Sequence, residues 1–95
     1  MIEYGNFEYY VAPGYVKVYG VEWCEFCKKT KDSLDKLGVS YTFLDVDKDI
    51  ISKQHFKEIG GSAYPLILTS NFLIKGYNEN VINEKFSKEN QSKKR

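Results

Sequence analysis

Hydrophobic and polar residues alternate along the chain in patterns that predict short strands and amphipathic helices. Residues 15–19 combine β-branched and aromatic side chains and predict a strand. The following segment, residues 24–37, predicts a helix whose inward face carries residues at intervals of three and four, namely Cys27, Thr30, Leu34 and Leu37. Gly38 then supplies the expected end of this helix.

The second half of the chain predicts a strand, a helix, a hairpin and a final helix. In chain order these are a strand at 40–46, a helix at 49–59, strands at 66–69 and 72–74, and a helix from Asn78 or Asn80 to Lys88. Asp47 or Asp49 can cap the helix at 49–59, and Gly60-Gly61 end it. Ser70-Asn71 has the composition of a two-residue hairpin turn.

The element order β-α-β-α-β-β-α is typical of the α/β class. We expect a mixed four-stranded sheet with helices on both faces. The strand at 40–46 follows the strand at 15–19 after a single helix, so we expect these two strands to run parallel.

The two ends of the chain are less regular. Residues 7–11 are β-prone, and Ala12-Pro13-Gly14 predicts a tight turn after them, so residues 1–14 form either an extra edge strand or a leader. The end, 89–95, is a polar tail. We expect one domain over residues 1–95.

Composition and charge exclude several classes of function. The chain has 95 residues, of which 42% are hydrophobic and 16% aromatic, enough for one core. A formal net charge of +1 gives no general case for binding nucleic acid or an anionic membrane, and Lys93-Lys94-Arg95 is interpreted as a solvated terminus. No apolar run approaches the roughly 18 residues of a membrane span. Residues 1–6 do not form a secretory signal, and two cysteines are too few to staple a secreted fold, so we expect a cytoplasmic protein.

The chemistry of the chain centres on its two cysteines, Cys24 and Cys27. A Cys-x-x-Cys pair between a strand and a helix indicates a redox centre. The first cysteine would stand at the helix N-terminus, where unpaired N–H groups and the helix dipole favour a thiolate. Cys24 is therefore the predicted nucleophile, and Cys27, one turn later, would resolve the mixed disulfide. Lys28 and Lys29 support the thiolate, whereas Glu25 opposes it.

The cysteines, His55 and Pro65 each have a simpler structural interpretation. A structural disulfide across so short a loop would contribute only about 2 kcal/mol. A zinc site needs four ligands, and beyond the cysteines the chain offers one distant histidine, His55, so we expect no metal. A lone helical histidine such as His55 is usually structural or exposed. Pro65 begins a strand, a position where proline is tolerated. Only about 5% of X–Pro bonds are cis, so residue type alone favours a trans Tyr64–Pro65 bond.

The chain resembles the thioredoxin superfamily, within it the glutaredoxin-like redoxins, and it is similar to the small redoxins encoded by large phages. The resemblance spans about residues 15–88 and rests on Lys17-Val18-Tyr19 before Cys24-Glu25-Phe26-Cys27, on Tyr64-Pro65 before a hairpin, and on Lys75-Gly76-Tyr77-Asn78 after it. It implies a thioredoxin-like fold with a cis Pro65 facing Cys24. The implied substrate-binding residues are Trp23, Phe26, Tyr64, Pro65, Gly76, Tyr77 and Asn78.

The same resemblance implies an enzyme, a dithiol–disulfide oxidoreductase that reduces protein disulfides, with ribonucleotide reductase as a client. No cofactor is expected to be bound, and the electrons would come from NADPH through glutathione or through thioredoxin reductase. Val21 and Lys75 stand where glutaredoxins usually have a lysine and a glycine, and Tyr64 replaces a small residue, which argues against a standard glutathione site. The alternative is a glutathione-dependent glutaredoxin that removes glutathione from proteins or holds an iron–sulfur cluster. We expect a monomer in the cytoplasm, or in the host cytoplasm for a phage protein.

Overall fold

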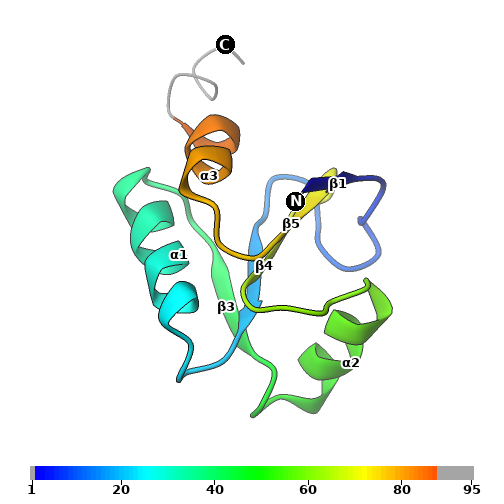
Figure 1. Ribbon diagram of the computed structural model, residues 1–95. Helices are drawn as coiled ribbons and strands as arrows, with labels where there is room; N and C mark the ends of the chain where they lie inside the picture. The colour runs from blue at the N-terminus through cyan, green and yellow to red at the C-terminus, as the bar shows by residue number, and fades with distance from the viewer. Residues whose placement is uncertain (1, 88–95) are drawn as a thin grey trace.

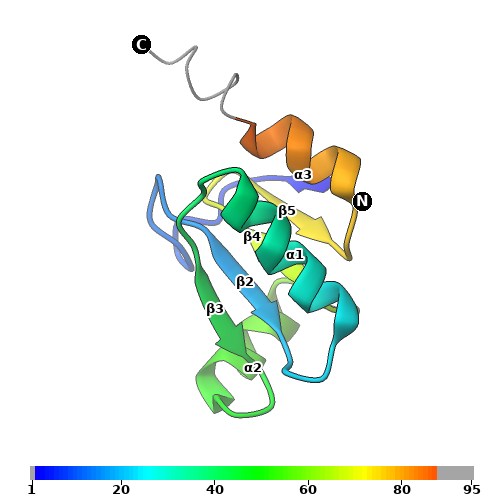
Figure 2. The same cartoon turned by 90° about the vertical axis from the view of Figure 1, so that its left-hand side faces the viewer.

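The computed structural model describes residues 2–87, which form a five-stranded sheet in the order β1-β5-β4-β2-β3. Its elements are β1 (Ile2–Tyr4), β2 (Lys17–Gly20), α1 (Glu25–Lys36), β3 (Thr42–Asp45), α2 (Ile50–Glu58), β4 (Leu66–Leu68), β5 (Phe72–Lys75) and α3 (Glu79–Phe86). Strands β2 and β3 are parallel, and all other pairs are antiparallel. Helices α1 and α3 lie on one face of the sheet and α2 on the other (Figures 1 and 2).

Alternation along the central strands supplies one hydrophobic layer to each face of the sheet. Val18, Ile67 and Ile74 pack with residues of α1 and α3, whereas their neighbours Tyr19, Leu66 and Leu73 pack on the side of α2. Because strand side chains point alternately to the two faces, each strand contributes to both layers. Both cysteines belong to the layer on the α2 side, at the end of the sheet where β2 leads into α1.

The expected order β-α-β-α-β-β-α is confirmed from β2 to α3, as are the parallel β2–β3 pair and the helices on both faces. The sheet has five strands instead of four because Ile2–Tyr4 pairs with β5 as an edge strand. The predicted end of the last helix at Lys88 and the polar tail 89–95 lie outside the described residues.

Residues 1–14 do contain the extra edge strand, at Ile2–Tyr4, but the β-prone residues 7–11 form no strand. This segment forms turns, in which the Phe7 carbonyl accepts hydrogen bonds from the N–H groups of Tyr10 and Val11. Phe7, Tyr10 and Val11 lie at spacings of three and four, so a turn directs all three to the same hydrophobic layer, which a strand cannot do. The predicted turn at residues 12–14 is confirmed by a hydrogen bond from Tyr15 N–H to Ala12 O, with Gly14 at φ +89°.

Local signals explain where the helices begin and end. The side chains of Cys24, Asp49 and Asn78 accept hydrogen bonds from the first turns of α1, α2 and α3. Gly38 and Gly60 follow α1 and α2 with positive φ angles, the left-handed ending that glycine adopts without steric cost. No helix within residues 2–87 is long and apolar enough to cross a bilayer.

Candidate active site

Cys24 is the N-cap of α1, as the sequence predicted. Its Sγ accepts a hydrogen bond from the backbone N–H of Cys27, in the first turn of the helix, at 3.2 Å. The helix N-terminus places a positive partial charge beside the sulfur. Cys24 keeps 9% of its surface exposed and Cys27 only 1%, so Cys24 is the more accessible of two buried cysteines. Both cysteines are free thiols in this structure.

The environment of Cys27 keeps its thiol protonated. Burial raises the pKa of Cys27 to about 12, and the hydrogen bond and charge of Cys24 act in the same direction, whereas the Val21 backbone and Lys31 lower it. A thiol of this kind does not ionise at neutral pH while Cys24 lies beside it. The two sulfurs are thus chemically distinct, one at the helix N-terminus and the other a buried proton donor.

Gly20, at the end of β2, belongs to the site although the sequence alone did not predict it. A Cβ atom at this position would lie 2.5 Å from Cys27 Sγ and 3.1 Å from the Phe43 ring. Only glycine allows the end of β2 to approach the buried sulfur so closely. The signal in the sequence was a glycine closing an otherwise β-branched and aromatic strand.

Two pairs of aromatic rings flank Cys24. Trp23 contacts Tyr64 edge-to-face with ring centroids 6.2 Å apart, and Phe26 stacks on Tyr77 at 5.9 Å. Trp23 is 73% exposed and Phe26 52%, large values for aromatic side chains. We refer to these pairs as the Trp23–Tyr64 wall and the Phe26–Tyr77 wall.

The remaining expected binding residues lie around the same end of the sheet. The Tyr64–Pro65 peptide bond is cis, as the family resemblance implied, and the Pro65 ring is buried. The Pro65 carbonyl accepts a hydrogen bond from Gly76 N–H at 2.7 Å, which joins the segment before β4 to the segment after β5. Asn78 caps α3, with its side-chain oxygen accepting the Val81 N–H.

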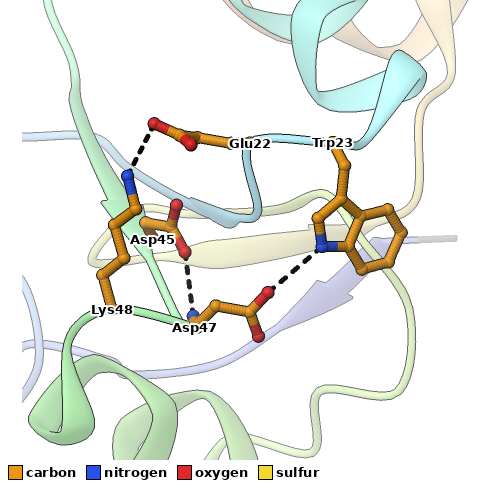
Figure 3. Close-up of polar contacts among 5 residues, drawn as sticks. All are labelled: Glu22, Trp23, Asp45, Asp47 and Lys48. Atoms are coloured by element: carbon orange, nitrogen blue, oxygen red, sulfur yellow. Dashed lines mark hydrogen bonds and ion pairs between the residues drawn. The ribbon is translucent and has the colours of Figure 1, made fainter.

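A cluster of polar contacts, which the sequence analysis did not predict, holds the loop that precedes Cys24 (Figure 3). Trp23 Nε1 donates to the Asp47 carboxylate at 3.1 Å, and the Asp47 N–H donates to Asp45 at 2.8 Å. On the other side of the loop, Lys48 forms an ion pair with Glu22 at 2.7 Å. These contacts tie the β2–α1 loop to the β3–α2 loop.

The positions that argued against a glutathione site have defined surroundings. Val21 is 1% exposed and belongs to the hydrophobic layer beneath the cysteines. Lys75 forms an ion pair with Glu3 of the edge strand β1 at 2.9 Å. His55, which lies on α2, contacts the Tyr10 ring. Within residues 2–87, no group of three or more His, Cys, Asp or Glu side chains could hold a metal ion.

Comparisons with known proteins assign the family. A family model described as Glutaredoxin matches residues 16–74. A glutaredoxin from Archaeoglobus fulgidus is 28% identical with a TM-score of 0.63, and the match covers 73% of this chain and 82% of that chain. The glutaredoxin-like NrdH-redoxin from Escherichia coli is 19% identical with a TM-score of 0.67, covering 73% and 91%. A thioredoxin from Fasciola hepatica is 19% identical with a TM-score of 0.57, covering 78% and 80%.

The likeness to the NrdH-redoxin and to the Fasciola hepatica thioredoxin shows only a shared thioredoxin-like fold. No curated protein sequence matches the chain significantly. The Glutaredoxin model, by contrast, spans more than half of the chain and includes both cysteines. The chain therefore belongs to the glutaredoxin family, and it is a thiol–disulfide oxidoreductase with a thioredoxin-like fold.

Proposed function

We propose that this single-domain protein reduces disulfides of other proteins, with Cys24 as nucleophile and Cys27 as resolving thiol. The Cys24 thiolate attacks one sulfur of the partner disulfide, the partner S–S bond breaks, and the departing sulfur takes a proton. Cys27 then loses its proton and attacks the Cys24 sulfur. This closes the Cys24–Cys27 disulfide and releases the second partner thiol, so two electrons pass to the partner.

The observation that carries this order of events is the contrast between the two sulfurs. Cys24 Sγ accepts the N–H of Cys27, and Cys24 is the more accessible of two buried cysteines, whereas the Cys27 thiol has a pKa raised to about 12. A protonated, buried thiol is a poor first nucleophile. Once Cys24 is bound in a mixed disulfide, its negative charge is gone, and one of the causes that raise the pKa of Cys27 is removed with it.

The surroundings of Cys24 favour a polypeptide as the substrate. The exposed rings of Trp23 and Phe26, one and two residues from Cys24 in the chain, offer apolar contact area, and they contact Tyr64 and Tyr77. A hydrogen bond between Gly76 N–H and Pro65 O joins the segments that carry Tyr64 and Tyr77, and Asn78 caps the helix that follows. We infer that a partner segment binds along these residues.

For the source of electrons, we infer NADPH through a thioredoxin reductase in preference to glutathione. The position three residues before Cys24 is the buried Val21, which offers no charge to a glutathione carboxylate. Lys75, the other candidate cation, is neutralised by Glu3. The NrdH-redoxin of Escherichia coli, which is described as having a thioredoxin-like activity profile, shares this fold. By analogy, a ribonucleotide reductase in the cytoplasm is the proposed client of a monomeric protein.

A reductase exchange tests the source of electrons. Oxidised protein is given NADPH with thioredoxin reductase, or NADPH with glutathione and glutathione reductase, and NADPH oxidation is followed with insulin as substrate. We expect turnover with thioredoxin reductase to exceed turnover with glutathione, and a Cys27→Ser variant to lose it. Faster turnover with glutathione, or a brown protein that binds iron and sulfide with glutathione, would instead support the glutathione-dependent alternative.

A further inference from the structure

The two walls beside Cys24 differ in charge. Asp45 and Asp47 lie on the side of the Trp23–Tyr64 wall, where Asp47 accepts the indole N–H of Trp23. On the Phe26–Tyr77 wall, Lys29 Nζ lies 5.6 Å from the centre of the Phe26 ring. The charged partners of the two exposed rings therefore differ in sign, a carboxylate at Trp23 and an ammonium group at Phe26.

Tyr64 is affected by the same carboxylates. Burial raises the pKa of Tyr64, and the charges of Asp47 and Asp45 act in the same direction. The Trp23–Tyr64 wall therefore lies in the field of two carboxylates. Lys48 pairs with Glu22 and also interacts with the charge of Asp45, but one lysine leaves the three carboxylates Glu22, Asp45 and Asp47 in excess.

Trp23 adds a second contribution to the acidic wall. Its N–H is held by Asp47 while most of the ring remains exposed. An indole face attracts cations, and a guanidinium can stack on the ring while it also pairs with a carboxylate. Because the hydrogen bond already orients the ring, less side-chain entropy is lost when a partner binds there.

We propose that the partner polypeptide carries an arginine or lysine beside the cysteine that Cys24 attacks, and that this basic side chain binds against Trp23, Asp45 and Asp47. Lys29 beside the Phe26 ring disfavours a second basic residue at that ring. This inference rests on the proposed function, since it requires a polypeptide substrate. It does not follow from overall charge, because the formal net charge of the chain is +1 and would weakly repel a basic peptide.

Single-turnover reduction of three peptides tests this inference. Each peptide is a symmetric disulfide dimer, so either sulfur has the same neighbour, and the three differ only in having arginine, glutamine or glutamate beside the cysteine. Reduced protein is mixed with each one, and the reaction is followed through Trp23, the single tryptophan of the chain. We expect the second-order rate constant for the arginine peptide to exceed that for the glutamate peptide by about three- to tenfold at low salt. High salt should narrow this ratio.

Variants separate the local carboxylates from other charges. The double variant Asp45→Asn/Asp47→Asn keeps an oxygen to accept each hydrogen bond but removes both charges, and it should lose most of the arginine preference. Asp32→Asn, on the exposed surface of α1, is the matched control and should keep the preference. Equal rates for the three peptides, no effect of salt on the wild-type ratio, or an unchanged ratio in the double variant would overturn this inference alone. Failure to reduce any of the peptides would instead count against the proposed function.

Discussion

The backbone N–H of Cys27 donates to the Sγ of Cys24 at 3.2 Å, so the residue proposed to resolve the mixed disulfide is hydrogen-bonded to the residue proposed to attack. The Cys27 side chain is affected separately, because burial first and then a side-chain hydrogen bond with Cys24 raise its pKa to about 12. One turn of helix thus gives the two thiols different reactivities.

This difference predicts selective alkylation of the reduced protein. At neutral pH, iodoacetamide should modify Cys24 at least tenfold faster than Cys27, because Cys27 is both buried and protonated. The measurement is peptide mass spectrometry after a timed reaction. In a Cys24→Ser variant, the rate at Cys27 should rise only at strongly alkaline pH. Comparable rates at the two sites in the native protein would contradict the assigned order.

Tyr19 provides a prediction about stability. Its side chain is fully buried, and within residues 2–87 its hydroxyl has no hydrogen-bond partner. An unsatisfied buried hydroxyl costs about 1–3 kcal/mol, so Tyr19→Phe should raise the free energy of unfolding by about 1 kcal/mol. Urea unfolding at pH 7 measures this change, and a clear loss of stability would show that the hydroxyl has a partner.

The same residue predicts a dependence on alkaline pH. Burial raises the pKa of Tyr19 from 10.0 to about 12, so the folded protein holds this proton more tightly than the unfolded chain does. The free energy of unfolding should therefore fall as pH rises from about 10 towards 12. Tyr19→Phe should show a smaller fall than the wild-type protein over this range, and an equal fall would assign the effect to other groups.

Gly20 and Cys27 should be energetically coupled. A Cβ at Gly20 would lie 2.5 Å from Cys27 Sγ, so Gly20→Ala should destabilise the reduced protein by about 1–3 kcal/mol through overpacking. In a Cys27→Ala background the sulfur is absent, and the cost of Gly20→Ala should be smaller. A double-mutant cycle from urea unfolding gives the coupling energy. Additive effects would mean that the contact is relieved elsewhere.

Several parts of this fold could be predicted because their signals are local. Cys24, Asp49 and Gly38 each mark a helix end through residue type and spacing alone. The parallel β2–β3 pair follows from the single helix between these strands. Nearby residues and ordinary chain connectivity were sufficient for these features.

Other parts depend on contacts that nearby residues do not encode. Strand β1 has only three residues and is defined by its pairing with β5, far along the chain. The aromatic composition of residues 7–11 indicated a strand, but burial against the layer on the α2 side gave them a turn. The Trp23–Asp47 hydrogen bond and the approach of Gly20 to Cys27 likewise arise only when separate elements meet.

The Trp23–Asp47 contact can be observed directly. Trp23 is the single tryptophan, so its indole N–H gives one side-chain signal in a nitrogen–proton NMR spectrum. Asp47→Ala removes the acceptor and should shift this signal upfield and speed its exchange with water, whereas Asp47→Asn retains an oxygen and should change it less. Because the bond is exposed, the loss of stability should stay within about 1 kcal/mol. An unchanged signal in Asp47→Ala would exclude the contact in solution.

The most direct test of the central claim is the trapping of the mixed disulfide. Reduced Cys27→Ser protein is mixed with a disulfide-bonded peptide, and intact-mass and peptide mass spectrometry identify the linked cysteine. The proposed order predicts a stable adduct at Cys24 in this variant, and little or no adduct at Cys27 in the matched Cys24→Ser variant. Ready formation of an adduct at Cys27 in Cys24→Ser, or none at Cys24 in Cys27→Ser, would contradict the account.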